Sequence, residues 1–290
     1  MSATTLVRPA ISITPATPRR RVARWLSSLV LMGIAVLFLV PLTWVVLSAV
    51  DPQATVSLTL PGEVSGENFR AILTPELTFQ PLLNSLVLSL GTGVVTVLAA
   101  VLAAYPLSRY QLRFRRSFMY GILFGTCLPI TAIMVPVYAL FVRLSLLDSM
   151  AGTIAFLAAS ALPMAIWMAK NFMDSVPVSL EEAAWVDGAG AMQTLARIVV
   201  PLMRPGIAVV FIFVFTQAWG NFFVPFVLLF DPALQPAAVA IYQFFGTYGT
   251  VAYGQLAAFS ILYAAPVMLL YLVVQRLAGG SFALAGAVKG

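Results

Sequence analysis

Histidine is absent from this chain of 290 residues, and cysteine occurs only once, as Cys127 in an apolar run. Without histidine, the chain lacks the side chain that most often acts as a general base near neutral pH and that most often binds metal ions. A single cysteine can form neither a disulfide bond nor a thiolate cluster within one chain. We therefore predict no catalytic residue, no metal site and no cofactor bound by this chain itself.

Charged residues are also scarce: they make up 9% of the chain, whereas 61% of the residues are hydrophobic and the mean hydropathy is +0.99. A soluble core cannot bury so much apolar surface, so the composition indicates a polytopic protein of the lipid bilayer. The net charge of +6 does not indicate a nucleic-acid partner, because the basic residues lie between hydrophobic segments and are not concentrated on one face.

Six apolar segments reach the length of about 20 residues that a helix needs to cross the hydrocarbon layer. They are residues 26–50, 83–108, 119–142, 151–169, 206–230 and 256–275. None contains Asp, Glu, Lys or Arg, so an ion relay within the chain is not expected. The first segment exceeds the core of a signal peptide and is interpreted as an uncleaved span. The predicted fold is all-α, with a six-helix transmembrane domain at 26–275 between tails at 1–25 and 276–290.

Basic residues predict the orientation, because Lys and Arg are retained on the cytoplasmic side of a membrane. If the N-terminus lies inside, every basic residue except Arg70 and Arg143 falls in an inside segment. Both termini and the loop at 170–205 are therefore expected in the cytoplasm. The external loop at 231–254 is rich in aromatic residues, which either anchor the chain at the membrane interface or form a docking surface. These residues are Tyr242, Phe244, Phe245, Tyr248 and Tyr253.

The first half of the cytoplasmic loop predicts a short helix. Ser179 and Glu182 form a capping-box pattern, in which Ser179 is the N-cap and Glu182 reaches back to a free amide. The side chains of Ala183 and Ala184 are small, so another surface can approach this side of the helix closely. Gly188 can take the left-handed conformation that ends a helix.

The second half of the loop predicts an amphipathic helix, because Met192, Leu195 and Val199 recur at helical spacing before Pro201. Residues 174–203 are therefore expected to form a helix-turn-helix at the membrane surface. Such a loop can rest on the bilayer, but lipid-bound helices favour a basic polar face. This loop has more acids, Asp174, Glu181, Glu182 and Asp187, than bases, Lys170, Arg197 and Arg204. A protein partner is therefore the favoured interpretation.

The spacing within this loop resembles that of a known family. Glu182-Ala183-Ala184, three residues, Gly188, nine residues and Ile198-x-x-Pro201 is similar to the coupling loop of permease subunits in binding-protein-dependent ABC importers. Further stretches resemble the carbohydrate-type permeases that are related to the shorter membrane subunit of the maltose importer. These are Asn84-Ser85-Leu86, Leu146-Leu147-Asp148-Ser149 and the C-terminal Gly286-Ala287-Val288-Lys289-Gly290.

The resemblance implies a division of labour among several proteins. An external solute-binding protein would deliver a sugar, a related polyol or a glycerol phosphate ester, and this chain and a second, homologous permease would each form half of the path. Two ATPase subunits would bind ATP and Mg and would contact this chain through residues 179–201 and the C-terminus. The chain itself would be a transport subunit of the bacterial cytoplasmic (inner) membrane and not an enzyme. The implied contact residues are Glu182, Ala183, Ala184, Asp187, Gly188, Ile198 and Pro201 in the loop, and Gly286, Lys289 and Gly290 at the C-terminus.

Candidate path residues lie in the fifth segment. Gln217 and Asn221 are four residues apart and share a helix face, beside Trp219, which can stack on a sugar ring while the amides bind hydroxyl groups. Polar residues in membrane helices serve equally as bonds between helices. A secondary transporter is the main alternative function, although an ion relay and an inverted repeat are missing. A membrane enzyme is the third, and it lacks a catalytic group.

Overall fold

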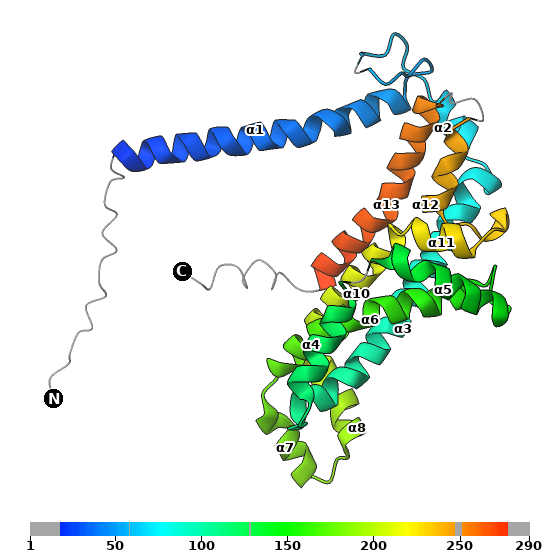
Figure 1. The fold of residues 1–290 in the computed structure, drawn as a ribbon. Helices are drawn as coiled ribbons and strands as arrows, with labels where there is room; N and C mark the ends of the chain where they lie inside the picture. Colours follow the sequence, from blue (N-terminus) through cyan, green and yellow to red (C-terminus); the bar gives the residue numbers. More distant parts are fainter. Residues whose placement is uncertain (1–17, 58, 128, 247–250, 278–290) are drawn as a thin grey trace.

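Helices make up the regular structure of this protein (Figure 1). The computed structural model describes residues 18–57, 59–127, 129–246 and 251–277. Across these ranges there is no β-strand, only an isolated bridge between Phe245 and Val251. The prediction of an all-α fold is confirmed.

Four helices are long and apolar enough to cross a membrane, and each coincides with a predicted span. They are α1 (Pro18–Ala49), α3 (Gln80–Arg109), α6 (Met150–Asp174) and α13 (Tyr253–Leu277). The π-helical turn η1 (Pro75–Phe79) leads directly into α3, and Thr74 caps it by accepting a hydrogen bond from Leu77 N at 3.2 Å. Two further pairs of helices are each bent at a short break: Arg115–Gly125 with Ile130–Arg143, and Ala191–Leu202 with Arg204–Trp219. The number of spans rises to six if each of these pairs crosses the membrane once.

The predicted third span, residues 119–142, is divided into two helices. These are α4 (Arg115–Gly125) and α5 (Ile130–Arg143), whose axes differ by 90°. Pro129 precedes α5 in extended backbone, with φ −65° and ψ 130°. Because proline has no amide hydrogen to donate, it cannot continue the ladder of a preceding helix. The expectation of one continuous helix over this segment is therefore wrong.

The predicted fifth span, residues 206–230, is also interrupted. α10 (Arg204–Trp219) and α11 (Phe223–Leu228) are separate helices. Between them, Asn221 Oδ1 accepts a hydrogen bond from Val224 N at 3.0 Å and so satisfies one of the amides that the start of α11 leaves free. The expectation of one continuous helix is wrong here as well, because a side-chain amide supports a new helix start.

The core of the bundle lies where α3 packs against α6 on one side and α10 on the other. Glycine permits this close approach. A Cβ atom on Gly91 would lie 2.7 Å from Ile154 Cδ1 of α6, and one on Gly93 would lie 2.7 Å from Phe211 Cε2 of α10. Small residues at such crossings let membrane helices make extensive van der Waals contact.

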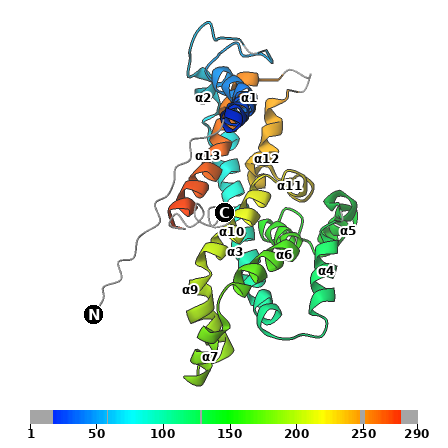
Figure 2. The same ribbon diagram turned by 90° about the vertical axis from the view of Figure 1, so that its left-hand side faces the viewer.

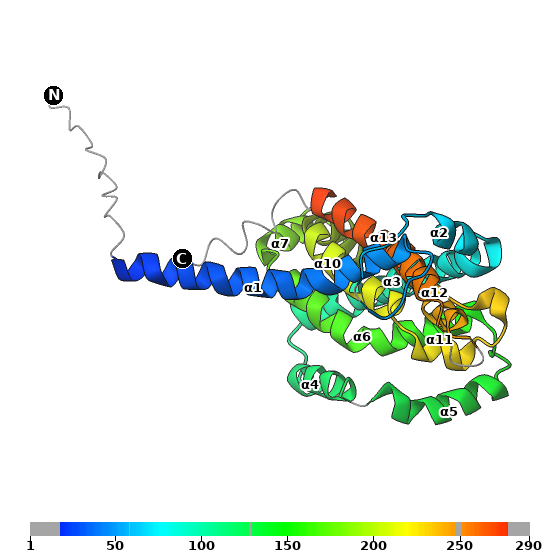
Figure 3. The same ribbon diagram turned by 90° about the horizontal axis from the view of Figure 1, so that it is seen from above.

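Helix α1 projects away from this bundle (Figures 1 and 3). Its side chains from Trp25 to Thr43 are exposed, and most of them are apolar. At its C-terminal end, the Trp44 ring meets Tyr253 of α13 edge-on, with 6.3 Å between the ring centroids. The exposed apolar length suits an environment of lipid or other membrane helices.

The opposite end of the bundle from residues 178–202 carries a folded cap that packs on α3. It contains α2 (Glu67–Ile72), η3 (Pro232–Leu234), α12 (Ala237–Ala240) and η4 (Ile241–Phe244). Asn84 Nδ2 of α3 donates to Ala233 O at 2.8 Å, and Ser85 Oγ accepts from Ala237 N at 2.8 Å. The start of α3 thus fixes a loop that lies about 150 residues further along the chain.

The aromatic residues predicted for loop 231–254 have different environments. Tyr242 and Phe245 are exposed, Phe244 is buried, and Tyr253 is half-buried against Trp44. Tyr248 lies outside the described residues. The loop therefore presents aromatic surface, which fits both an interfacial anchor and a docking surface.

Candidate functional site

The segment predicted as a helix-turn-helix lies at one end of the bundle (Figures 1 and 2). Its first helix is α7 (Val178–Val186), which begins one residue before Ser179. No side chain caps this helix start; Pro177 precedes it in extended backbone, and Leu180 N donates to Pro177 O at 3.3 Å. The predicted capping box of Ser179 and Glu182 is wrong, because the N-cap is Pro177, two positions before Ser179, and Ser179 lies inside the first turn of the helix.

Helix α7 ends in a Schellman motif around Gly188. Gly188 has a φ of +85° and donates its amide to Trp185 O at 3.0 Å, while Ala189 N donates to Ala184 O at 2.9 Å. These two bonds satisfy carbonyls at the helix end, and the left-handed residue between them favours glycine. The predicted left-handed turn at Gly188 is confirmed.

The second helix of the segment runs through three consecutive pieces. They are α8 (Ala191–Thr194), the π-helical turn η2 (Leu195–Val199) and α9 (Val200–Leu202), after which the chain bends by 81° into α10. Leu195 and Val199 are buried as expected of an apolar face, but Met192 is 65% exposed. Met192 lies in the first turn of this helix and is not covered by the bundle. Pro201 does not end the helix, which continues to Leu202.

The residues predicted to contact an ATPase are mostly accessible. Glu182, Ala183, Asp187 and Gly188 are exposed, whereas Ala184, Ile198 and Pro201 are half-buried. A groove of about 270 Å³ lies between the two helices and brings together Ala184, Asp187, Gly188 and Ile198. It is completed by Ala189, Gln193, Thr194 and Arg197.

Sequence reasoning missed Glu181, which is the buried residue of α7. Its carboxylate is bound by Arg109 and Tyr105, both from the end of α3. The available signal was weak: two adjacent acids in the loop and one arginine at the end of an apolar span. Since ionised side chains are buried only when they are paired, the acid and the base had to be considered together.

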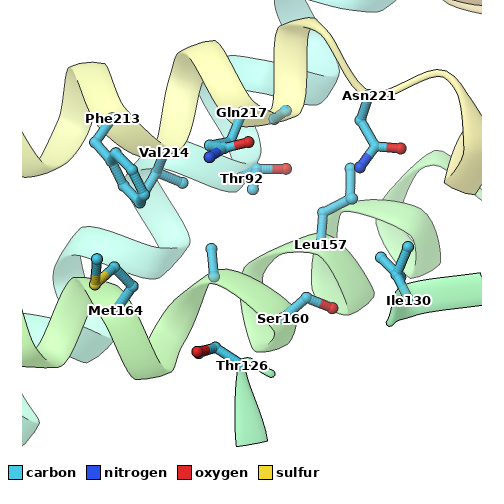
Figure 4. A pocket seen from close by; sticks show the side chains of 12 residues that line it. Thr92, Thr126, Ile130, Leu157, Ser160, Met164, Phe213, Val214, Gln217 and Asn221 are labelled. Carbon is cyan, nitrogen blue, oxygen red and sulfur yellow. The ribbon is translucent and has the colours of Figure 1, made fainter. Parts of the chain in front are cut away.

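A second candidate site is a cavity of about 320 Å³ between α3, α6, α10 and the break that separates α4 from α5 (Figure 4). Gln217 and Asn221 line it, together with Ser160, Thr126 and Thr92. Thr92 Oγ1 is buried without a hydrogen-bond partner among the described residues. The remaining lining residues are Ile130, Leu157, Ala161, Met164, Phe213, Val214 and Ala218. No lining residue carries a formal charge, so the cavity suits a neutral solute that has both polar and apolar surface.

Trp219 does not line this cavity. Its ring is 4% exposed and is stacked between Phe215 and Tyr263, with centroid distances of 5.6 and 5.4 Å. Successive helix residues turn by about 100°, so residue 219 faces away from Gln217 and Asn221. With both ring faces covered, Trp219 packs helices together in this arrangement and is not open to a sugar.

The predicted C-terminal contact residues, Gly286, Lys289 and Gly290, lie outside the described residues.

The long apolar helices and the bent helix pairs together define a multi-pass membrane protein. Residues 96–280 match the family described as the inner membrane component of binding-protein-dependent transport systems. The chain belongs to this family and is a permease subunit of the ABC importer class. This confirms the resemblance that the loop spacing indicated.

Curated relatives and solved structures agree with this assignment. The trehalose transport system permease protein SugB of Mycobacterium tuberculosis is 31% identical over 87% of this chain and 93% of its own length. The glucose import system permease protein GlcU of Saccharolobus solfataricus is 29% identical over 90% of this chain and 94% of its own. A chain of a bacterial ABC transporter that imports the acidic polysaccharide alginate has the same fold, with a TM-score of 0.79, 22% identity and coverage of 91% of this chain and 99% of that chain.

Proposed function

We propose that this chain forms half of the membrane path of an ATP-driven importer for a neutral sugar or related polyol. The observation that carries the proposal is the exposed helix-turn-helix at one end of the bundle, with a left-handed turn at Gly188 and a groove beside it. Relatives that are named for trehalose and glucose transport support a carbohydrate as the solute. The uncharged cavity lining supports a neutral sugar over a glycerol phosphate ester, because a phosphate group would find no cation there.

The proposed partners follow from the same class. A second, homologous permease would supply the other half of the path, an external solute-binding protein would deliver the sugar, and two ATPase subunits would bind ATP and Mg. A solved alginate importer in complex with a periplasmic protein that holds an alginate pentasaccharide has a related fold, with a TM-score of 0.62, which supports an external solute-binding protein as a partner. In the proposed orientation both termini and α7 face the cytoplasm, because basic residues concentrate on that side.

In the proposed coupling mechanism, the ATPase binds α7 and the adjacent groove. Glu182, Ala183, Asp187 and Gly188 are exposed and accessible to a partner, whereas Ala184, Ile198 and Pro201 are half-buried. Closure of the ATPase pair on ATP would then move α7 as a rigid body. Gly286, Lys289 and Gly290 at the C-terminus are proposed as an additional ATPase contact.

Gentle affinity purification of the chain from its native membranes tests the proposed function. Mass spectrometry of the bound proteins is expected to identify an ATPase and a second permease. Recovery of a stable oligomer of this chain alone, together with solute uptake driven by an ion gradient without ATP, would establish a secondary transporter instead.

Gln217 provides a test of the proposed solute cavity. Gln217→Ala is expected to raise the KM for solute uptake by about 2- to 10-fold, the loss of one hydrogen bond, with little change in ATPase assembly. Radiolabelled uptake into proteoliposomes measures this change. Thr216→Val is the matched control, since Thr216 Oγ1 donates to Ile212 O of its own helix at 2.8 Å and does not line the cavity. Equal KM values for Gln217→Ala and the unaltered chain would exclude Gln217 from the path.

A further inference from the structure

Helix α7 joins the membrane bundle through a carboxylate. Glu181 has a fully buried side chain, whereas Ala184 is half-buried and the other residues of α7 are exposed. An amphipathic helix usually attaches to its neighbours through an apolar face. In α7 the buried position is held by a charged group, which is costly to bury unless specific partners compensate it.

Two residues of α3 provide that compensation. Arg109 Nε donates to Glu181 Oε1 at 2.5 Å, and Tyr105 OH donates to Glu181 Oε2 at 3.0 Å. Both carboxylate oxygens are therefore bonded. The Arg109 side chain is only 4% exposed, so water screens the pair little.

The same arginine also binds the end of α6. Arg109 Nη2 donates to Met173 O, in the last turn of α6, at 3.0 Å and to Val176 O, two residues beyond the end of α6, at 3.1 Å. Ser108 extends this connection by donating to Asp174 Oδ1 at 2.6 Å. One guanidinium group thus ties together the ends of α3 and α6 and the middle of α7.

Helices α3 and α6 also form walls of the solute cavity. Thr92 of α3 and Ser160 of α6 line it, and Thr92 lies roughly 25 Å along α3 from Arg109 at the helical rise of 1.5 Å per residue. A helix held by the Arg109 group cannot move without moving the ends of these two walls. The chain therefore has a continuous connection from α7 to the cavity through packed, hydrogen-bonded elements.

We propose that the ion pair of Glu181 with Arg109, supported by Tyr105, is the rigid joint that transmits the movement of α7 to α3 and α6. The proposal rests on the proposed function, in which the ATPase moves α7. It assigns Glu181 and Arg109 as positioning residues for transport and gives Glu181 a role different from that of its exposed neighbour Glu182. The two adjacent acids thus have different roles: Glu182 faces the ATPase, and Glu181 connects α7 to the bundle.

The ratio of solute transported to ATP hydrolysed distinguishes this joint from a contact that merely folds α7. We compare the unaltered complex with Glu181→Gln, Arg109→Gln and the double variant in proteoliposomes. Glu63→Gln, the same change at an exposed acid outside α7, is the control. Each single variant is expected to keep the ATPase bound and hydrolysing while the ratio falls about tenfold. The double variant is expected to be no worse than either single variant, because the two residues act as one unit.

A milder substitution, Tyr105→Phe, and a measurement of the distance between α7 and α3 provide a second test. Tyr105→Phe keeps the ion pair and is expected to lower the ratio by about 2- to 10-fold, through the loss of one hydrogen bond. Spin labels at Val186→Cys and Leu98→Cys, both exposed, in a Cys127→Ser background, report the distance between α7 and α3. One narrow distance, unchanged by ATP, is expected with the joint intact, and a broad distribution is expected in Glu181→Gln and Tyr105→Phe.

The results separate this proposal from the proposed function. An unchanged ratio in Glu181→Gln, or a loss of transport that only parallels a loss of bound ATPase, would overturn the joint. If the glutamine variants do not fold, a Tyr105→Phe chain with an unchanged ratio and a narrow distance also overturns it. Failure of the unaltered chain to recruit any ATPase would instead refute the proposed function.

Discussion

Replacing Gly188 with valine is expected to lower ATP-driven transport at least tenfold and to release the ATPase from the complex. The backbone of Gly188 has a φ of +85°, where a side chain with a Cβ costs about 1–2 kcal/mol and a β-branched one more. Relief of this strain would break the bonds from Gly188 N to Trp185 O and from Ala189 N to Ala184 O, which hold the end of α7. The groove beside α7 would lose its shape. Uptake assays and the amount of co-purified ATPase measure both effects.

Gly190→Val is the matched control for this prediction. Gly190 lies two residues away, but its backbone is extended, with φ −76° and ψ 162°, and a Cβ there meets no atom within 4 Å. Valine favours extended backbone, and Gly190 makes no side-chain cap that valine would remove, so transport is expected to stay within about threefold of the unaltered chain. A similar loss in both variants would mean that bulk at the surface matters and that the left-handed turn does not.

The turn at Gly188 could be predicted from the sequence because its signal is local. Two alanines precede a glycine at the distance of one helical turn, and the chemistry of a helix end then selects glycine. The same reasoning predicted an apolar side for the second helix from the spacing of its residues, and the structure buries Leu195 and Val199 of that side. Met192 has the same spacing but is 65% exposed, since periodicity indicates which side of a helix is apolar and not what covers that side.

The role of Glu181 could not be predicted in this way. Its partners lie 72 and 76 residues away, and Glu181 and Glu182 are chemically identical in the sequence. Which of the two acids faces the bundle depends on how α7 is rotated against α3, and the local sequence does not specify this rotation. Hydropathy likewise could not locate the interruptions at Pro129 and Asn221, because both lie within continuous apolar runs.

Replacing Gly206 with alanine is expected to destabilise the protein by about 1–3 kcal/mol through overpacking. Gly206 lies at the start of α10, against the end of α6. A Cβ there would lie 2.4 Å from Phe172 Cγ and 2.6 Å from Phe172 Cβ. Since the Phe172 Cβ is fixed by its own backbone, a change of side-chain rotamer cannot remove the clash. The two helices must separate, close to the carbonyls that Arg109 binds at the end of α6.

Thermal unfolding in detergent, followed by the loss of monodisperse protein, measures this effect as a fall in Tm of about 3–10 °C. Gly121→Ala is a control with the opposite expected result. Gly121 lies inside α4, and a Cβ there would meet no atom within 4 Å. Alanine at this position is therefore expected to raise stability by about 0.5–1 kcal/mol. Adding Phe172→Ala to Gly206→Ala removes the Cγ contact but leaves the Cβ contact, so the combined loss should be smaller than the sum of the single losses. A Gly206→Ala chain as stable as the unaltered protein would mean that α6 and α10 cross at a greater distance than this packing requires.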